Sequence, residues 1–299
     1  MKTVLVTGAT GFIGGHLLKT LASHPEYGSC RIVLLSSRAI EGQETILHRN
    51  YTFTRADFAA KAIDKIELVI HAGAFIPKRG ADANNVDGST ENITYLRHLL
   101  QELPCVPERF VFLSTVDVYK PTGEEMSEDS VVEPVSLYGW SKLYGEKMLE
   151  AWAAEGNVIV QNLRIGHIYG SGEEQYAKII PLSIRKAMKG EPLTIFTTGE
   201  ELRSFLHVRD CVRLILKAAS LDKSEGPINV VSGRPYPIRR IVELIAAATG
   251  TGSAVQIEGR NATPARSLVF NNEKMVRLLG PEQVLFEEGL KEEISEFRL

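Results

Sequence analysis

The stretch that decides the fold is the beginning of the chain, Met1-Lys-Thr-Val-Leu-Val-Thr-Gly-Ala-Thr-Gly-Phe-Ile-Gly14. A short apolar β-run is followed by a turn with glycines at Gly8, Gly11 and Gly14, and an amphipathic helix begins directly after it. This order is typical of a dinucleotide-binding strand, turn and helix. Gly8 permits the tight turn, Gly11 lets backbone N–H groups approach a pyrophosphate, and Gly14 lets the helix pack closely on the strand. A P-loop is excluded because no Gly-Lys-Ser/Thr ends the turn.

The composition of the 299 residues is that of an ordinary soluble globular protein, with 44% hydrophobic and 24% charged residues. The formal net charge is −3, so the protein as a whole does not attract polyanions. Neither nucleic acid nor a membrane surface is therefore expected as a partner. No apolar run reaches the roughly 18 residues of a membrane span. The three cysteines, Cys30, Cys105 and Cys211, lie far apart without metal-ligand spacing. They predict no metal site and a reduced, cytoplasmic compartment.

Short β-branched runs alternate with helical patterns in the first half of the chain. The expected strands are residues 4–6, 31–35, 68–71, 110–113 and 158–163. The expected helices follow Gly11 and cover residues 90–103 and 138–154. This alternation predicts an α/β fold with a doubly wound, parallel sheet of the Rossmann type.

The sequence pattern changes after about Arg164, because the expected loops are longer and the expected helices shorter. We therefore expect residues 1–164 to form a dinucleotide-binding domain and residues 165–299 to form mainly a smaller substrate-binding part. Residues 204–230 are expected to return to the sheet.

The segment Tyr138-Gly-Trp-Ser-Lys142 begins a predicted helix and carries the candidate catalytic pair. Their spacing puts Tyr138 and Lys142 on one helix face, one turn apart. A phenol with a pKa of about 10 transfers protons poorly at neutral pH. A nearby ammonium and the positive charge of an oxidised nicotinamide are expected to lower that pKa. The same spacing also occurs on ordinary helices with a half-buried tyrosine and a solvated lysine, but the upstream dinucleotide turn favours catalysis.

Two hydroxyl residues, Ser114 and Thr115, directly follow the apolar run 110–113 and lie at the carboxyl end of that expected strand. Open α/β sheets bind ligands at this end of their strands. Thr115 is the stronger candidate for orienting a substrate oxygen toward Tyr138. For both hydroxyl residues, a backbone-capping turn is the alternative.

These stretches resemble motifs of the extended short-chain dehydrogenases/reductases, the nucleotide-sugar epimerase/dehydratase group, over nearly the whole chain. Six stretches match in order: TGATGFIG at 7–14, His71-Ala-Gly-Ala74, Asn85-Val-Asp-Gly-Ser89, Leu113-Ser-Thr-Val-Asp-Val-Tyr119, the pair Tyr138 and Lys142, and Arg203-Ser-Phe-Leu-His-Val-Arg-Asp210. The resemblance implies an NAD(P)-dependent enzyme in which Thr115, Tyr138 and Lys142 are catalytic. It also implies cofactor contacts from Tyr138, Lys142, Gly8, Thr10, Gly11, Phe12, Ile13, Gly14, Ala72, Gly73 and Ala74.

The resemblance further implies a small-molecule substrate, namely a nucleotide-linked sugar. Arg203 stands where the family usually meets the nucleotide phosphates, and His167 stands where an asparagine usually contacts the diphosphate. A histidine still donates a hydrogen bond to phosphate, and a packed structural histidine is the alternative. Family 4,6-dehydratases carry an Asp-Glu pair after the catalytic threonine, whereas this chain has Val116 and Asp117. Water elimination is therefore disfavoured, and Asp117 either assists proton transfer at the substrate or is a solvated or capping residue.

The tip of the second expected strand reads Ser36-Ser37-Arg38, where NAD-preferring members of the fold carry an acidic residue for the adenosine ribose. Two hydroxyls and a guanidinium suit a 2′-phosphate instead, with Arg38 as its bidentate partner. An ordinary surface charge is the alternative for Arg38. NADP(H) is therefore favoured over NAD(H). Asp57, after a third expected strand, resembles the family's adenine-contacting aspartate.

Without the dehydratase pair and the NAD-type acid, the chain is best interpreted as a ketoreductase of a nucleotide-linked sugar. The alternatives are a nucleotide-sugar 4-epimerase with a retained cofactor and a cofactor-sensing protein without catalysis, although relatives of the latter kind generally lack the pair Tyr138 and Lys142. The resemblance also implies a homodimer that pairs through the helices at 90–103 and 138–154. Compatible with that interface, or with the core of one chain, are the apolar residues Leu143, Met148, Leu149 and Trp152.

Overall fold

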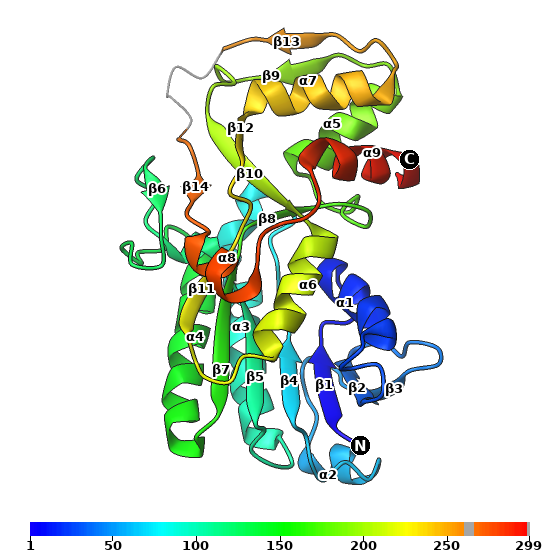
Figure 1. Cartoon of the computed structure of the whole chain (residues 1–299), viewed down its shortest axis with the longest axis vertical. Coiled ribbons are helices and arrows are strands. Elements are labelled where there is room, and N and C mark those ends of the chain that lie inside the picture. Colours follow the sequence, from blue (N-terminus) through cyan, green and yellow to red (C-terminus); the bar gives the residue numbers. More distant parts are fainter. Residues whose placement is uncertain (260–265, 298–299) are drawn as a thin grey trace.

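The computed structural model describes residues 1–259 and 266–297, and its centre is a seven-stranded sheet (Figure 1). The strand order is β11-β7-β5-β4-β1-β2-β3, and every neighbouring pair is parallel. The strands are β1 (Thr3–Thr7), β2 (Arg31–Ser36), β3 (Glu44–Leu47), β4 (Leu68–His71), β5 (Arg109–Thr115), β7 (Ile159–Ile165) and β11 (Gly226–Val230). The chain winds outward from β1 in both directions, which confirms the predicted doubly wound α/β fold.

Helices cover both faces of this sheet. Val4 and Val6 of β1 belong to a core shared with two helices on one face, and Leu5 belongs to a core shared with the helices on the other. Because both faces are buried, the strands are apolar almost throughout, and their positions are therefore visible in the sequence. The first face carries α1 (Phe12–Ser23) and α6 (Val208–Ala219), and the second carries α2 (Arg55–Ala59), α3 (Val86–Glu102) and α4 (Leu137–Gly156).

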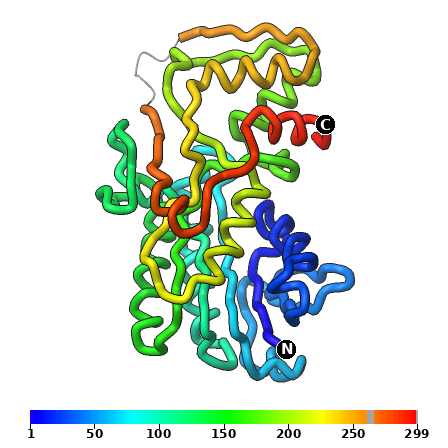
Figure 2. The backbone as a smooth tube through the Cα atoms, viewed as in Figure 1, coloured from blue at the N-terminus to red at the C-terminus, as the bar shows by residue number. Residues whose placement is uncertain are grey.

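A second part of the chain lies beyond the carboxyl ends of the strands, at the top of Figure 1, and has its own apolar core. Its elements are β8 (His167–Tyr169), α5 (Ile179–Met188), β9 (Leu193–Ile195), β10 (Leu202–His207), β12 (Pro235–Pro237), α7 (Ile238–Thr249), β13 (Val255–Ile257) and α9 (Phe286–Glu296). Beside the two parts lie β6 (Glu125–Met126), which pairs with β14 (Val269–Phe270), and α8 (Glu273–Leu279). The backbone passes between the sheet and this second part repeatedly (Figure 2).

One expectation about this chain path needs correction. Residues 208–230 do return to the sheet as α6 and β11, but residues 204–207 belong to β10, which pairs with β8 and β12 in a separate three-stranded sheet. The physical reason is that β11 occupies the edge beside β7, along residues 161–165. The division into two domains at residue 164 stays a prediction.

The apolar residues proposed for a dimer interface pack inside the single chain. Leu143 and Leu149 belong to its buried cores, and Met148 and Trp152 pack against one of them. The homodimer therefore stays a prediction without these residues as its support. Across residues 1–259 and 266–297, no helix combines the length and the apolar character that crossing a bilayer requires.

The glycine turn between β1 and α1 confirms the backbone roles expected of Gly8 and Gly14. Gly8 has a φ of +72°, and a Cβ there would lie 2.5 Å from the backbone carbonyl carbon of Ala72, just after β4. A Cβ on Gly14 would overlap the carbonyl group of Gly8. By contrast, a Cβ on the next residue, Gly15, would come no closer than 3.9 Å to other atoms. The turn thus sets how closely the first helix approaches the first strand.

Replacing Gly14 by alanine should lower the free energy of unfolding by about 1–3 kcal/mol or more, because the overlapping atoms are backbone and cannot rotate away. Gly15→Ala is the matched control on the same helix. It should leave the stability unchanged or raise it by up to about 1 kcal/mol, because alanine is the better helix former. Chemical denaturation of both variants measures the difference, and equal stabilities would contradict the packing role of Gly14.

A pair of buried carboxyl groups joins α9 to the loop that follows β8. Glu293 of α9 is 0% exposed and Glu173 of the loop is 2% exposed, and their carboxyl groups lie close enough to influence each other's pKa. Two neighbouring carboxyl groups that are both removed from water resist being charged at the same time. Burial is the main cause that raises the pKa of both groups above the ordinary value of 4.5.

The folded protein therefore keeps a proton that the unfolded chain releases above pH 4.5. Since the folded state binds more protons there, the free energy of unfolding should fall as the pH rises from that value to about 8. Glu293→Gln removes this titration, so its stability profile should be flatter and its stability at about pH 8 higher than that of the wild type. Denaturant unfolding across this range tests the prediction, with the exposed Glu288→Gln as control. Parallel profiles for Glu293→Gln and the wild type would disprove it.

Candidate active site

A cavity of about 760 Å³ lies between the carboxyl ends of the sheet strands and the second part of the chain. Its walls come from the glycine turn after β1, the ends of β2, β4, β5 and β7, the beginning of α4, and the loop between β8 and α5. Open α/β sheets bind their ligands at this edge, where the strand order reverses. The volume is that of a ligand pocket of ordinary to large size.

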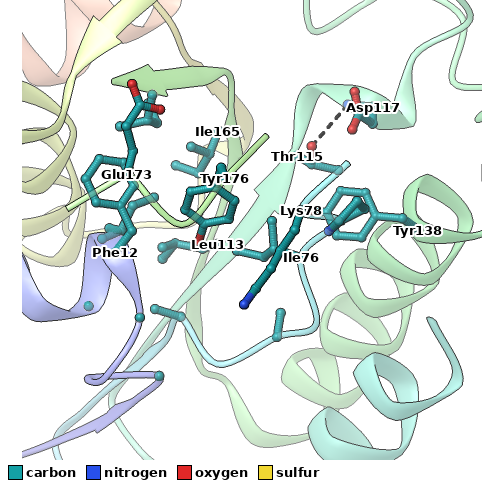
Figure 3. Close-up of a pocket in the computed structure, with 18 of the residues that line it drawn as sticks. Phe12, Ile76, Lys78, Leu113, Thr115, Asp117, Tyr138, Ile165, Glu173 and Tyr176 are labelled. Atoms are coloured by element: carbon teal, nitrogen blue, oxygen red, sulfur yellow. Dashed lines mark hydrogen bonds between the residues drawn. The ribbon is translucent and has the colours of Figure 1, made fainter. Parts of the chain in front are cut away.

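Almost all predicted site residues line this one cavity. They are Gly8, Thr10, Gly11, Phe12, Ile13, Gly14, Ser36, Ser37, Ala72, Gly73, Ala74, Thr115, Asp117, Tyr138, Lys142, His167 and Arg203. Figure 3 shows Thr115, Asp117 and Tyr138 together on one side of the cavity, and Phe12, Glu173 and Tyr176 on the other. The fold therefore brings the dinucleotide turn and the catalytic candidates to a common space.

Two predicted residues lie outside the cavity lining. Asp57 sits in the first turn of α2, where its carboxylate accepts hydrogen bonds from the backbone N–H (2.7 Å) and the hydroxyl (3.1 Å) of Thr54. Asp57 thus caps its own helix, and the expected third strand before it is β3. The adenine contact of Asp57 stays a prediction. Arg38 is exposed, and its backbone N–H donates to the hydroxyl of Ser36 at 3.2 Å.

The first turn of α4 places Tyr138 against the end of β5. The helix begins after Ser136, whose hydroxyl accepts a hydrogen bond from the backbone N–H of Gly139 at 3.1 Å. The side chain of Thr115 lies near enough to the phenol of Tyr138 to lower the pKa of that phenol. Thr115 in turn caps the short 3₁₀ helix η2 (Val116–Val118), because its hydroxyl oxygen accepts from the backbone N–H of Asp117 at 3.2 Å. Thr115 therefore both caps a turn and faces the phenol.

The groups that this chain supplies raise the pKa of Tyr138, and its lowering by a bound nicotinamide stays a prediction. Burial raises the pKa of Tyr138, the nearby Asp117 carboxyl raises it further, and the neighbouring Thr115 side chain lowers it only in part. Lys142 cannot fully compensate, because burial lowers its own pKa to about 7 and so favours the uncharged amine. Its Nζ lies 4.3 Å from the ring centroid of Phe112. Burial therefore disfavours the charged form of both members of the pair.

The opposite end of the cavity carries polar and cationic groups. His167 is buried, which lowers its pKa to about 4, and its Nδ1 has no hydrogen-bond partner among the described residues. The Nη1 of the half-buried Arg203 donates to the carbonyl of Leu202 at 2.8 Å and to that of Arg266 at 2.7 Å. Lys178, from the loop before α5, lies near enough to lower the pKa of both His167 and Asp117. This end is suited to an anionic or polyhydroxylated ligand.

Several cavity residues have no sequence signal. His48, Tyr51 and Tyr95 form an aromatic wall near the end of β2, with the rings of Tyr51 and Tyr95 4.4 Å apart. Lys78 reaches into the cavity from the loop after β4 (Figure 3). Lys178 and Tyr176 come from the loop between β8 and α5. They were missed because loops have no periodic pattern, and only tertiary packing brings these residues to the cavity.

The residues around the glycine turn fit a dinucleotide. The helix α1 begins after Gly11, which offers no side-chain cap, so the N–H groups of its first turn line the cavity without an internal acceptor. The glycines at 8 and 14 hold this turn in place, because a Cβ at either position would run into backbone atoms. An uncapped helix N-terminus with a glycine cradle is the usual arrangement for a pyrophosphate.

Comparison with known proteins gives consistent results. A model of a protein family, described as "NAD dependent epimerase/dehydratase family", matches residues 4–231 of this chain. A Bacillus subtilis protein described as the uncharacterized UDP-glucose epimerase YtcB is 25% identical, over 98% of this chain and 96% of that protein. The dTDP-4-dehydro-6-deoxy-D-allose reductase of Streptomyces bikiniensis is 26% identical, over 99% of this chain and 96% of that protein.

Solved structures agree with this assignment. The structure of MoeE5 in complex with UDP-glucose and NAD superimposes with a TM-score of 0.83 at 29% identity, covering 98% of this chain and 97% of that one. The match of the family description to most of the chain confirms the resemblance read from the motifs. The chain therefore is an enzyme of the NAD dependent epimerase/dehydratase family, within the extended short-chain dehydrogenases/reductases.

Proposed function

We propose that the chain is an NADP(H)-linked ketoreductase that acts on a keto carbon of a nucleotide-linked sugar. The observation that carries the proposal is the single cavity in which the glycine turn, Thr115, Tyr138 and Lys142 all take part. Nucleotide-sugar reductases and epimerases both occur among the full-length relatives. Water elimination is disfavoured because Val116 stands where dehydratases carry an aspartate.

In this mechanism the dinucleotide, when bound on the glycine turn, supplies the hydride. Thr115 holds the substrate oxygen beside Tyr138, and the phenol donates the proton that this oxygen takes up on reduction. The raised pKa of Tyr138 suits this direction, because the phenol stays protonated until the oxygen needs a proton. Lys142 holds the cofactor ribose and, when charged, stabilises the phenolate that the transfer leaves.

The polar end of the cavity provides the binding groups for the nucleotide sugar. Arg203 and Lys178 supply positive charge for a diphosphate, and the unpartnered Nδ1 of the neutral His167 supplies one further hydrogen bond. The carboxyl group of Asp117 lies near enough to Tyr138 to raise the pKa of the phenol. From this position it contacts a sugar hydroxyl next to the reacting carbon.

The preference for NADP(H) rests on the tip of β2. Ser36 and Ser37 line the cavity there and offer hydroxyls instead of a carboxylate. The next residue, Arg38, is exposed and lies outside the lining, so it must extend toward a 2′-phosphate to bind it. A carboxylate at this position would repel that phosphate, and its replacement by hydroxyls removes the repulsion.

A nucleotide-sugar 4-epimerase with a retained cofactor is the second candidate. It is favoured by the epimerase description of the Bacillus subtilis relative and by the NAD and UDP-glucose bound to MoeE5. The same three catalytic residues serve both reactions, since an epimerase oxidises and then reduces the same carbon.

Incubation of the enzyme with NADPH and a nucleotide-linked 4-keto sugar should consume NADPH in equal amount to the product formed, followed as loss of nicotinamide absorbance. Tyr138→Phe should lower this rate about 100-fold or more while NADPH binding is kept, because the proton donor is lost but the cofactor site is intact. Conversion of a UDP-hexose to its epimer without added cofactor, and without absorbance change, would show the epimerase instead. A fully active Tyr138→Phe enzyme would overturn both candidates.

The cofactor preference is tested by titration calorimetry with NADP⁺ and NAD⁺. Arg38→Ala should weaken NADP⁺ binding about 10-fold or more, as expected for the loss of a charge-assisted hydrogen bond, and should leave NAD⁺ binding unchanged as an internal control. If the wild-type enzyme bound NAD⁺ more tightly than NADP⁺, the preference proposed here would be wrong.

A further inference from the structure

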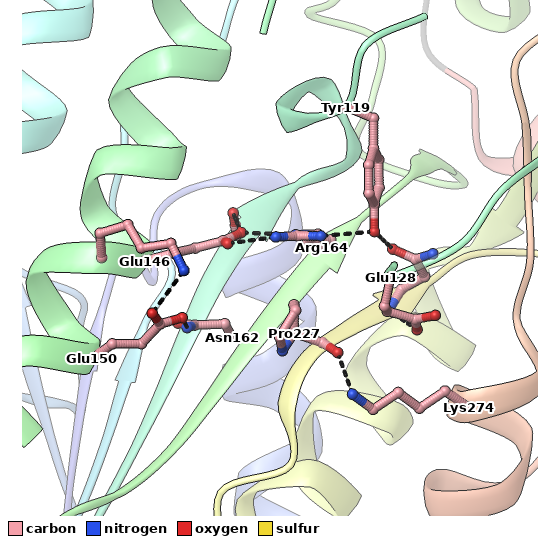
Figure 4. Close-up of polar contacts among 11 residues, drawn as sticks. Tyr119, Glu128, Glu146, Glu150, Asn162, Arg164, Pro227 and Lys274 are labelled. Carbon is pink, nitrogen blue, oxygen red and sulfur yellow. Dashed lines mark hydrogen bonds and ion pairs between the residues drawn. The ribbon is translucent and has the colours of Figure 1, made fainter. Parts of the chain in front are cut away.

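A buried charged network joins Glu146 of α4 to Arg164 of β7 and to Tyr119 (Figure 4). Its centre is Glu146, which follows Lys142 by one turn on α4 and is 0% exposed. The carboxylate of Glu146 accepts two hydrogen bonds from Arg164 of β7, from Nε at 3.1 Å and from Nη2 at 2.9 Å. It also accepts a hydrogen bond from the hydroxyl of Ser114 at 2.5 Å. The residue directly before the catalytic Thr115 is thereby fixed to the catalytic helix.

The network continues from Arg164 to the other side of the site. The Nη1 of Arg164 donates to the phenol oxygen of Tyr119 at 2.9 Å, and this phenol donates to Oδ1 of Asn229 at 2.6 Å. Tyr119 directly follows η2, the turn that carries Asp117. One set of hydrogen bonds therefore links α4, β5, β7, β11 and the turn beside the substrate end.

Charge balance gives this network a role beyond packing. Tyr138, Lys142 and Glu146 lie at successive turns of α4 on the same face. Glu146 is the charged neighbour that favours the ammonium form of Lys142, against the effect of burial. Arg164 remains charged at all working pH values and neutralises much of the charge of Glu146. The fraction of Lys142 that is charged thus depends on how much of the negative charge of Glu146 is neutralised by Arg164.

The other titratable groups near Lys142 are uncharged at neutral pH. His71 of β4 is buried, which lowers its pKa to about 3, and the pKa values of Tyr95 on α3 and Tyr138 on α4 are raised by burial. From β5, the ring of Phe112 faces the ammonium. Among the described groups, the pair Glu146 and Arg164 is therefore the charged neighbour that influences the protonation of Lys142.

We propose that Glu146 and Arg164 are positioning residues that set the charge of Lys142, Glu146 by favouring the ammonium and Arg164 by limiting that effect. The inference rests on the proposed function of Lys142 at the cofactor and deepens it. A purely structural ion pair would leave the pKa of Lys142 unchanged whichever partner is removed. If the pair sets the charge of Lys142, removal of Glu146 alone and removal of Arg164 alone must shift the pKa of Lys142 in opposite directions.

The test is a pH titration of the protein labelled with ¹³C-lysine and followed by NMR, without cofactor or substrate. The resonance of Lys142 is identified by its absence in Lys142→Arg. Glu146→Gln should lower the pKa of Lys142 by about one unit or more, and Arg164→Met should raise it, because the first removes an attractive charge and the second a compensating one. The double variant, which removes both charges, should return the pKa close to that of the wild type.

Glu146→Gln is the decisive variant, because its amide oxygen still accepts hydrogen bonds from Arg164 and Ser114 and so keeps the fold. Asp210→Asn is the matched control: Asp210 is a buried carboxylate that pairs with Arg213 on α6, and its loss should leave the pKa of Lys142 unchanged. In the reaction, the alkaline limb of the rate profile should move to lower pH in Glu146→Gln and be restored in Glu146→Asp.

An unchanged pKa of Lys142 in Glu146→Gln would overturn the inference. A shift of the same size in Asp210→Asn would do so too, since the effect would then be general loss of packing. Neither result depends on catalysis, so each is separate from failure of the proposed function, which an active Tyr138→Phe enzyme would reveal.

Discussion

Burial of both faces of the seven-stranded sheet is the constraint on which the rest of this structure depends. Side chains from β1 alternate between two apolar cores. A polar side chain buried within a strand therefore needs partners, and Arg164 on β7 finds them in Glu146 and Tyr119, which satisfy its guanidinium. The polar groups that line the cavity lie at the strand ends, where the glycine turn, Thr115 and the loops of the second part meet.

The same burial determines the chemistry of the site. Removal from water makes the phenol of Tyr138 harder to ionise and the ammonium of Lys142 easier to deprotonate. A site that needs a charged lysine must therefore obtain that charge from neighbouring groups. The position of Glu146, one turn behind Lys142 and fully buried, supplies such a group from the same helix.

Membership of the family narrows the chemistry to hydride and proton transfer at a sugar carbon, but it does not distinguish reduction from epimerisation. In the proposed mechanism both reactions use Thr115, Tyr138 and Lys142, and they differ in whether the oxidised cofactor leaves. At the end of β2, where the adenosine ribose is expected, Ser36 and Ser37 line the cavity and Arg38 does not.

The sequence by itself determined the fold class, the glycine turn and most of the candidate residues of the site that line the cavity. Buried strands and one-turn spacing leave local patterns, and motifs such as Tyr138-x-x-x-Lys142 are contiguous in the chain. Contacts between distant segments leave no such pattern. Residues 204–207 join a separate sheet, and the groups of the chain itself raise the pKa of Tyr138, neither of which the local sequence indicated.

Tertiary structure alone brought the aromatic wall, Lys78 and Lys178 to the cavity and joined Glu146 to Arg164. The physical reason is that burial and electrostatics are properties of the surroundings in space, and neighbours in the sequence do not determine them.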